Sequence, residues 1–305
     1  MIKREVIEEA LFEACRRGTT VISKDVEQAF VRTIEKETNP AAKKGFETTL
    51  SSLHKSIERD IVICCDTGWP LYFFKIGDQC EIEGGVSSLR EAAEHAVARA
   101  TREGHLRATM KHPISGYDPG NNVGLNAPII EMKFVPGDGF EATFCAKGGG
   151  SECFGGTRQK VIAFADGLKA HEKCILDWYA EAAWQGAVCP PCVIGIGIGG
   201  TANESANLAK QAAALRAVGS HNPDPTFRKM EEDLYDAING LNIGIMGVGG
   251  DTSVFAVNVE YAFTHLDGII LSMACNCMVA RRGTMRVNAD NTMLPLDNAM
   301  WFGDR

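Results

Sequence analysis

The sequence predicts an α/β fold: a single domain with a mixed sheet flanked by helices, preceded by a helical N-terminal segment. Two observations predict it. After residue 60, helical patterns alternate with short apolar, β-branched runs, which is typical of a sheet covered by helices. Before residue 60, apolar residues recur at helical spacing only. We therefore divide the chain, 1–305, into a helical segment, 1–60, and an α/β core, 61–305.

In the first half of the core, short strands are expected on both sides of a helix. β-branched and aromatic runs predict strands at 61–65 (IVICC) and 71–77 (LYFFKIG). An Ala-rich pattern with interspersed Glu and Arg predicts a helix at 87–106. The stretch 111–128 is dense in Gly, Pro and Asn, so it forms a long loop, and such loops are often functional.

The second half of the core continues the alternation. We expect 129–135 and 140–148 to form a strand pair joined by Pro-Gly-Asp-Gly, followed by a glycine-rich loop. The remaining expected elements are one or two helices at 158–185, helices at 201–218 and 224–241, and strands at 192–200, 242–248, 254–263 and 267–276.

Composition excludes several classes of protein. The net charge is −8 over 305 residues, so the basic footprint of a nucleic-acid binder is missing, as is a polybasic membrane patch. The longest apolar run, GIILSMACNCMVA, is too short and too polar to span a bilayer. Residues 1–18 contain no unbroken apolar core, so they are not a secretory signal. We expect a cytoplasmic protein with no nucleic-acid or membrane partner.

Eleven cysteines need an explanation. Their number is odd and no export signal precedes them, so a disulfide framework is not expected. The informative cysteines come in local groups: Cys64 with Cys65, Cys189 with Cys192, and Cys275 with Cys277. The last two groups could form a four-thiolate structural zinc site. This alternative describes a non-catalytic binding or regulatory protein, and Cys189-Pro-Pro-Cys192 alone could be a redox pair.

Two glycine-rich motifs suggest ligand binding. Residues 195–200, GIGIGG, match the dinucleotide fingerprint after a strand, but the acidic residue expected ~20 positions later is missing. We prefer close packing of strand and helix as the reason for these glycines, over a nicotinamide-dependent oxidoreductase. Residues 147–157, KGGGSECFGGT, could form a backbone anion nest beside Lys147. Four more cationic side chains would then suit a small dianion: Arg107, His265, Arg281 and Arg282.

Five motifs occur together in the order of one known family. They are CCDTG at 64–68, KGGGSEC at 147–153, CPPCVIGIGIGGT at 189–201, RAVGSHNPDP at 216–225, and the stretch 247–277 with its glycines, His265 and Cys277. Over nearly the whole chain, the sequence resembles the α part of the class I fumarase and L-tartrate dehydratase family, the iron–sulfur hydro-lyases.

The resemblance implies a cofactor and a reaction. Cys64, Cys189 and Cys277 would hold a [4Fe-4S] cluster whose fourth iron has no protein ligand. That iron can act as a Lewis acid on the hydroxyl and one carboxylate of a small hydroxy-dicarboxylate substrate. Water would be removed or added reversibly, with malate and fumarate, or L-tartrate and oxaloacetate, as the pairs.

The remaining roles also follow from the resemblance. Asp66, Thr67 and His265 take the positions of catalytic residues. Substrate-binding positions fall on Cys65, Arg107, Gly148, Gly149, Gly150 and Ser151. Cys192 and Cys275 become packing residues. A separate β subunit is expected to supply further cationic groups and the catalytic base, because no such domain follows Arg305, and the assembly is expected to be a heterotetramer.

Three positions depart from the family pattern. Cys65 stands where a glutamine is usual, and a thiol cannot make the paired hydrogen bonds of an amide. Asp251 replaces a common lysine, which removes a positive charge, and Cys153 replaces an asparagine. These departures bear on which hydroxy-dicarboxylate the protein accepts.

Overall fold

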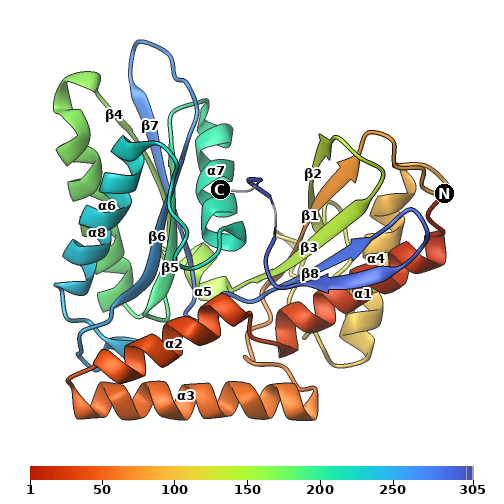
Figure 1. The fold of residues 1–305 in the computed structure, drawn as a ribbon, viewed down its shortest axis with the longest axis horizontal. Coiled ribbons are helices and arrows are strands. Elements are labelled where there is room, and N and C mark those ends of the chain that lie inside the picture. Colours follow the sequence, from red (N-terminus) through yellow and green to blue (C-terminus); the bar gives the residue numbers. More distant parts are fainter. Residues whose placement is uncertain (300, 304–305) are drawn as a thin grey trace. The chain divides into compact units, whose positions relative to one another are not determined.

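The computed structural model describes residues 1–299 and 301–303, and the chain forms two compact units (Figure 1). The first unit comprises 1–23, 52–148 and 281–299. The second comprises 24–51, 149–280 and the last described residues. Each unit is thus assembled from segments that lie far apart in the sequence.

The first unit is a five-stranded mixed sheet with helices packed against it. The strand order is β2-β1-β3-β8-β9, with β1 parallel to β2 and antiparallel to β3. Helix α1 contacts β3, β8 and α4, and the Tyr72 hydroxyl donates to the Leu11 carbonyl at 2.8 Å inside this core. The elements are α1 (Arg4–Thr20), β1 (Trp69–Gly77), α4 (Ser88–Arg102), β2 (Ile129–Val135), β3 (Phe140–Lys147), β8 (Arg282–Val287) and β9 (Met293–Leu296).

The second unit is built around a four-stranded mixed sheet of order β4-β7-β5-β6. Helix α7 covers one side of this sheet, and α6 and α8 lie on the other (Figure 1). The elements are α5 (Gly149–Cys153), β4 (Thr157–Ile162), η1 (Phe164–Asp166), α6 (Gly167–Trp184), β5 (Cys192–Ile198), α7 (Ala202–Leu215), α8 (Pro225–Asn239), η2 (Ile245–Gly247), β6 (Val254–Tyr261) and β7 (Ile269–Asn276).

Two more helices complete the N-terminal part, α2 (Lys24–Lys36) and α3 (Pro40–Arg59). Helix α2 and the first part of α3 belong to the second unit. There Phe30 packs edge-on against Phe46 and Phe255, with ring centroids 6.0 and 5.0 Å apart. These aromatic contacts attach the helices to β6.

The α/β class, the mixed strand directions and the helical N-terminal segment are confirmed. The strands divide into two sheets, which the alternation along the chain does not reveal. The assignment of 1–305 as one domain, divided at residue 60, stays a prediction. Within the described part of the chain, every helix is too short or too polar to pass through a bilayer.

Four local predictions were wrong. Residues 61–65 form no strand; the backbone instead bonds to helix ends, with the Ile63 N–H donating to the Thr19 carbonyl at 2.9 Å. Strands β2 and β3 are not a hairpin pair, because β1 lies between them. The polar run 157–162 is the edge strand β4 rather than a helix. Residues 242–248 turn instead of extending, since Gly244, Met246 and Gly247 all have positive φ.

Candidate active site

The Cys64–Gly68 segment lies in irregular backbone immediately before β1. Gly68 has φ +66°, and a Cβ there would lie 2.0 Å from the Lys147 carbonyl oxygen, so glycine is required. The Asp66 carboxylate accepts a hydrogen bond from the Gly68 N–H at 3.0 Å, which closes a tight turn. Thr67 is buried, with 1% of its surface exposed. Two polar side chains are therefore held in fixed positions at the start of a strand.

Arg107 follows α4 and returns to this segment. Its backbone N–H donates to the Thr67 hydroxyl at 3.0 Å, and its guanidinium Nη1 donates to the Cys65 carbonyl at 2.7 Å. The Arg281 guanidinium donates to the Asp66 carbonyl from the end of the chain. The first unit therefore brings together four of the predicted site residues, and Arg281 joins them. Arg107 itself is exposed.

The same cluster contains two residues that sequence reasoning missed. The Thr109 hydroxyl donates to the Gly68 carbonyl at 3.2 Å. The buried amide of Asn122 accepts hydrogen bonds from the backbone of Thr109 and Met110. Asn122 belongs to the 111–128 loop, whose composition marked it as functional. Nothing in that composition distinguishes Asn122 from its neighbours.

A pocket of about 540 Å³ opens next to the Arg107–Met110 segment. Trp69 and Met110, the chain neighbours of Gly68 and Thr109, contribute to its wall. Lys111 and His112 also line it, so it carries one cationic side chain, that of Lys111, and an imidazole. Such a wall can attract a carboxylate.

The predicted anion nest is distributed over the end of β3 and the short helix α5. Gly148 follows β3, and Gly149, Gly150 and Ser151 form the first turn of α5. A Cβ at Gly150 would lie 2.7 Å from the Ala187 carbonyl oxygen, so close packing requires this glycine. Anion binding by this turn stays a prediction.

Cys189 and Cys277 lie on neighbouring backbone of the second unit. The Met278 N–H donates to the Cys189 carbonyl at 3.2 Å. Cys189 is exposed and Cys277 is half-buried, so both thiols can be reached from solvent. Cys64, the third predicted ligand, is half-buried in the first unit. The ligand set for the cluster stays a prediction.

Cys192 and Cys275 lie in a different environment, inside strands β5 and β7. Both are fully buried. Burial, and then the proximity of Cys275, raise the pKa of the Cys192 thiol. Among the described residues, no group of three or more His, Cys, Asp or Glu side chains is arranged to hold a metal ion. This holds for the four thiols of the zinc alternative, Cys189, Cys192, Cys275 and Cys277, and equally for Cys64, Cys189 and Cys277.

His265 lies in the loop that crosses the end of β5. The Ala262 N–H donates to the Ile198 carbonyl at 2.9 Å, and a Cβ at Gly199 would lie 2.2 Å from the Ala262 carbonyl oxygen. The imidazole is 74% exposed, and its Nδ1 lies 3.1 Å from the Asp267 carboxylate. The Asp267 N–H also donates to Nδ1 at 3.4 Å, so Asp267 contacts this nitrogen through both its backbone and its carboxylate.

Close packing explains the GIGIGG motif. A Cβ at Gly195 would lie 2.0 Å from the Ala209 carbonyl oxygen, and one at Gly197 would lie 1.9 Å from the Ser205 carbonyl oxygen. Helix α7 can approach β5 only where side chains are absent. The packing interpretation is confirmed, and the glycines give no independent reason to expect a nicotinamide cofactor.

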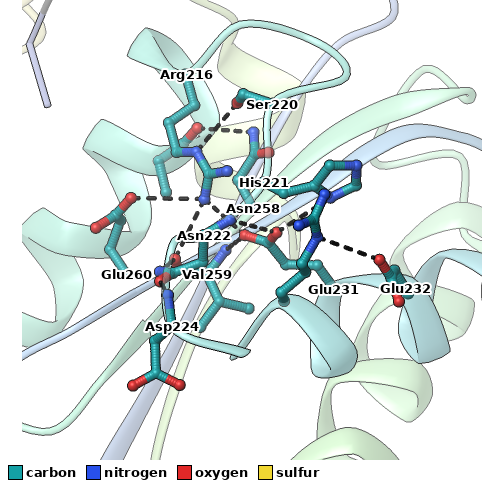
Figure 2. Close-up of polar contacts among 12 residues, drawn as sticks. Arg216, Ser220, His221, Asn222, Asp224, Glu231, Glu232, Asn258, Val259 and Glu260 are labelled. Atoms are coloured by element: carbon teal, nitrogen blue, oxygen red, sulfur yellow. Dashed lines mark hydrogen bonds and ion pairs between the residues drawn. The ribbon is translucent and has the colours of Figure 1, made fainter. Parts of the chain in front are cut away.

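The RAVGSHNPDP motif forms a buried polar network. Arg216 donates to the Glu231 carboxylate at 2.6 Å and lies 3.5 Å from the Glu260 carboxylate. All three side chains are at most 5% exposed. Figure 2 shows Arg216 between the two carboxylates. Because one guanidinium serves two buried carboxylates, this arginine is an internal structural group.

The same network joins three elements of the second unit (Figure 2). The Asn222 amide donates to the Val259 carbonyl at 2.7 Å, and the Asn222 N–H donates to Glu231 at 2.9 Å. Asp224 caps α8 by accepting from the Thr226 N–H at 2.8 Å. The motif therefore fixes the end of α7, the start of α8 and strand β6.

Comparison with known proteins identifies relatives of this chain. The family model for fumarate hydratase (Fumerase) matches residues 8–286. A protein of Methanocaldococcus jannaschii named putative L(+)-tartrate dehydratase subunit alpha is 32% identical over 93% of this chain and 98% of its own length. An L(+)-tartrate dehydratase subunit alpha of Escherichia coli strain UTI89 is 31% identical over 90% of this chain and 88% of its own.

The match covers most of the chain and identifies a hydro-lyase, the class that the motifs predicted. The chain belongs to the fumarate hydratase (Fumerase) family. The resemblance stated from the five motifs is therefore confirmed.

Proposed function

We propose that this chain is the α subunit of a cytoplasmic, iron–sulfur-dependent hydro-lyase that acts reversibly on a small hydroxy-dicarboxylate of the malate or L-tartrate type. One observation carries the proposal: hydrogen bonds join Arg107 to Cys65 and Thr67, on either side of Asp66, in one unit of a chain that belongs to the fumarate hydratase family.

The cysteines divide in a way that fits the proposed cluster. Cys64, Cys189 and Cys277 are accessible and lie outside strands, whereas Cys192 and Cys275 are sealed in the core. Iron–sulfur clusters are held by cysteine thiolates. When bound by the three accessible cysteines, a [4Fe-4S] cluster would supply a Lewis-acidic iron for the substrate hydroxyl.

The residues of this chain would bind and orient the substrate. No carboxylate of the described residues forms an ion pair with the exposed Arg107 guanidinium, so it can pair with a substrate carboxylate. One of its nitrogens is already fixed on the Cys65 carbonyl, which limits the rotamers that binding must select. Lys111 adds positive charge to the wall of the neighbouring pocket.

The remaining catalytic groups include residues of the second unit and a second chain. We assign His265 a role in proton transfer, supported by the Asp267 carboxylate on its Nδ1. The curated relatives are named as α subunits, which supports a separate β subunit. That subunit would complete the site in an αβ assembly, as a heterotetramer.

An anaerobic dehydration assay tests this function. The chain is purified with its second subunit and offered L-tartrate and L-malate. We expect formation of oxaloacetate or fumarate, and loss of activity on exposure to air. A complex that contains iron and sulfide but dehydrates neither compound would contradict the proposed substrate class.

A further inference from the structure

We propose that Asn122 is a positioning residue that fixes the substrate-binding arginine, Arg107. The Asn122 side chain is 1% exposed and comes from the 111–128 loop. Its Nδ2 donates to the Arg107 carbonyl at 2.7 Å and to the Thr101 hydroxyl at 3.0 Å. Its Oδ1 accepts from the N–H groups of Thr109 and Met110 at 2.8 and 3.1 Å. All four hydrogen-bonding positions of the amide are therefore occupied.

These bonds act on a segment that has no regular structure. Residues 107–112 belong to neither helix nor strand, so no ladder of backbone bonds holds them. Fixing the backbone of such a residue costs about 1–2 kcal/mol of conformational entropy. Asn122 bonds three successive backbone sites, at residues 107, 109 and 110, and thereby defines the path of the segment.

The position of Arg107 is then defined from two sides. Asn122 holds its carbonyl, and Thr67 accepts its N–H at 3.0 Å. Thr109 ties the same segment to the Gly68 carbonyl at 3.2 Å. Asn122 thus fixes the arginine relative to the Asp66–Gly68 turn without contacting a substrate itself.

Two properties of Asn122 have to be separated, its backbone conformation and its side-chain amide. Asn122 has φ +61°, a conformation that asparagine tolerates better than most residues. Asn126 lies in the same loop with φ +58°, but it is exposed, and among the described residues its side chain has no hydrogen-bond partner. Asn126→Ala therefore reproduces the backbone strain of Asn122→Ala without removing the amide network.

This inference rests on the proposed function, so the local structure and the binding of substrate are measured in separate experiments. Hydrogen exchange is measured on the full chain for Asn122→Ala, Asn122→Asp and Asn126→Ala. Asn122→Asp keeps both acceptor bonds and tolerates the backbone, but it replaces the Nδ2 donor by an oxygen that faces the Arg107 carbonyl, so it tests the donor bonds separately. We expect faster exchange at Thr109 and Met110 in Asn122→Ala, with the core strands unchanged and Asn126→Ala like the wild type.

Steady-state kinetics on L-tartrate and L-malate with the assembled enzyme provide the second readout. Because a displacement of about 1 Å can cost about 100-fold, we expect kcat/KM to fall about 10- to 100-fold in both Asn122 variants, mostly through KM. Faster exchange with unchanged KM would show a purely structural role and overturn the inference. Unchanged exchange would also overturn it. A wild-type enzyme that acts on neither substrate would remove the proposed function, and the inference with it.

Discussion

Two arginines show how differently the two units use the same side chain. Arg107 of the first unit is exposed and lies on irregular backbone, and within the described part of the chain its guanidinium bonds only to a backbone carbonyl. Arg216 of the second unit is 4% exposed and lies against two buried carboxylates. Arg216 shows that a charged residue in a family motif can serve the fold. Arg107 shows that a binding residue is recognised by hydrogen-bonding groups that remain available.

Cys189 and Cys192, which are three residues apart in the sequence, differ in the same way. Cys189 precedes β5 and is exposed, whereas Cys192 is the first residue of β5 and is fully buried. The start of the strand separates an accessible thiol from a packing residue.

The largest effect on catalytic activity is expected from a change at the binding arginine. Arg107→Ala removes the partner of a substrate carboxylate, and truncating one member of such a pair costs about 2–5 kcal/mol. We expect kcat/KM to fall about 30-fold to several-thousand-fold, since about 1.4 kcal/mol is tenfold. Thermal unfolding should be unchanged. Arg102→Ala, at the exposed end of α4, is the control, and equal losses in both variants would contradict the binding role.

Arg216→Ala should instead act on stability. The change leaves Glu231 and Glu260 buried without their guanidinium, and breaking a buried ion pair in this way costs about 3–5 kcal/mol. Denaturant unfolding measures this loss. Arg228→Ala removes an exposed pair with Glu232 on α8 and should cost at most about 1 kcal/mol. If the two variants unfolded alike, the contrast between internal and surface arginines would be lost.

A smaller effect is expected where helix α7 meets β5. In Gly197→Ala the new methyl would overlap the Ser205 carbonyl oxygen, and such overpacking costs about 1–3 kcal/mol. Gly124→Ala, where nothing lies within 4 Å, should be nearly neutral. Calorimetry measures the thermal unfolding of both variants. A neutral Gly197→Ala would revive a ligand-binding reason for the GIGIGG glycines.

The smallest effect concerns Asp251, the residue that replaces a family lysine. Hydrogen bonds from the Thr38 hydroxyl and N–H lower the pKa of Asp251. A carboxyl with a lowered pKa in the folded state stabilises the protein above its unfolded pKa, and this contribution is lost as the pH falls. Because Asp251 is exposed, the contribution is only a few tenths of a kcal/mol.

Asp251→Asn should therefore flatten the acid side of the stability–pH curve slightly, between about pH 5 and pH 2. Urea unfolding at several pH values measures the slope. A steeper acid slope in the variant would show that the Thr38 bonds do not act on the ionised form. The structure thus gives Asp251 a local role beside α2 and α3.

The sequence was sufficient for elements with strong local signals. Helix α8, with Asp224 as cap and Pro225 at its first position, and strand β5 were both predicted correctly. Pairing across the sequence was not readable, so β1 between β2 and β3 was missed. The edge strand β4 was mistaken for helix because most of its residues are at least half-exposed and polar.

Prediction of the candidate site has the same limit: local patterns can be read from the sequence, and contacts between distant residues cannot. The family resemblance sufficed to single out Asp66, Thr67 and Arg107; in the structure Arg107 donates to Thr67, and the Asp66 carboxylate accepts from the Gly68 N–H. Asn122 was not found, because its role depends on backbone atoms 12 to 15 residues away in the chain. Local composition marks a loop as functional, whereas only the folded chain shows which amide is buried.

The most direct test of the account compares the two cysteines of the C-x-x-C motif. Iron and acid-labile sulfide are measured after anaerobic purification in the wild type, Cys189→Ser and Cys192→Ala. We predict about four irons and four sulfides per chain in the wild type, their loss in Cys189→Ser and their retention in Cys192→Ala. A full cluster in Cys189→Ser, or zinc without sulfide in the wild type, would contradict the account.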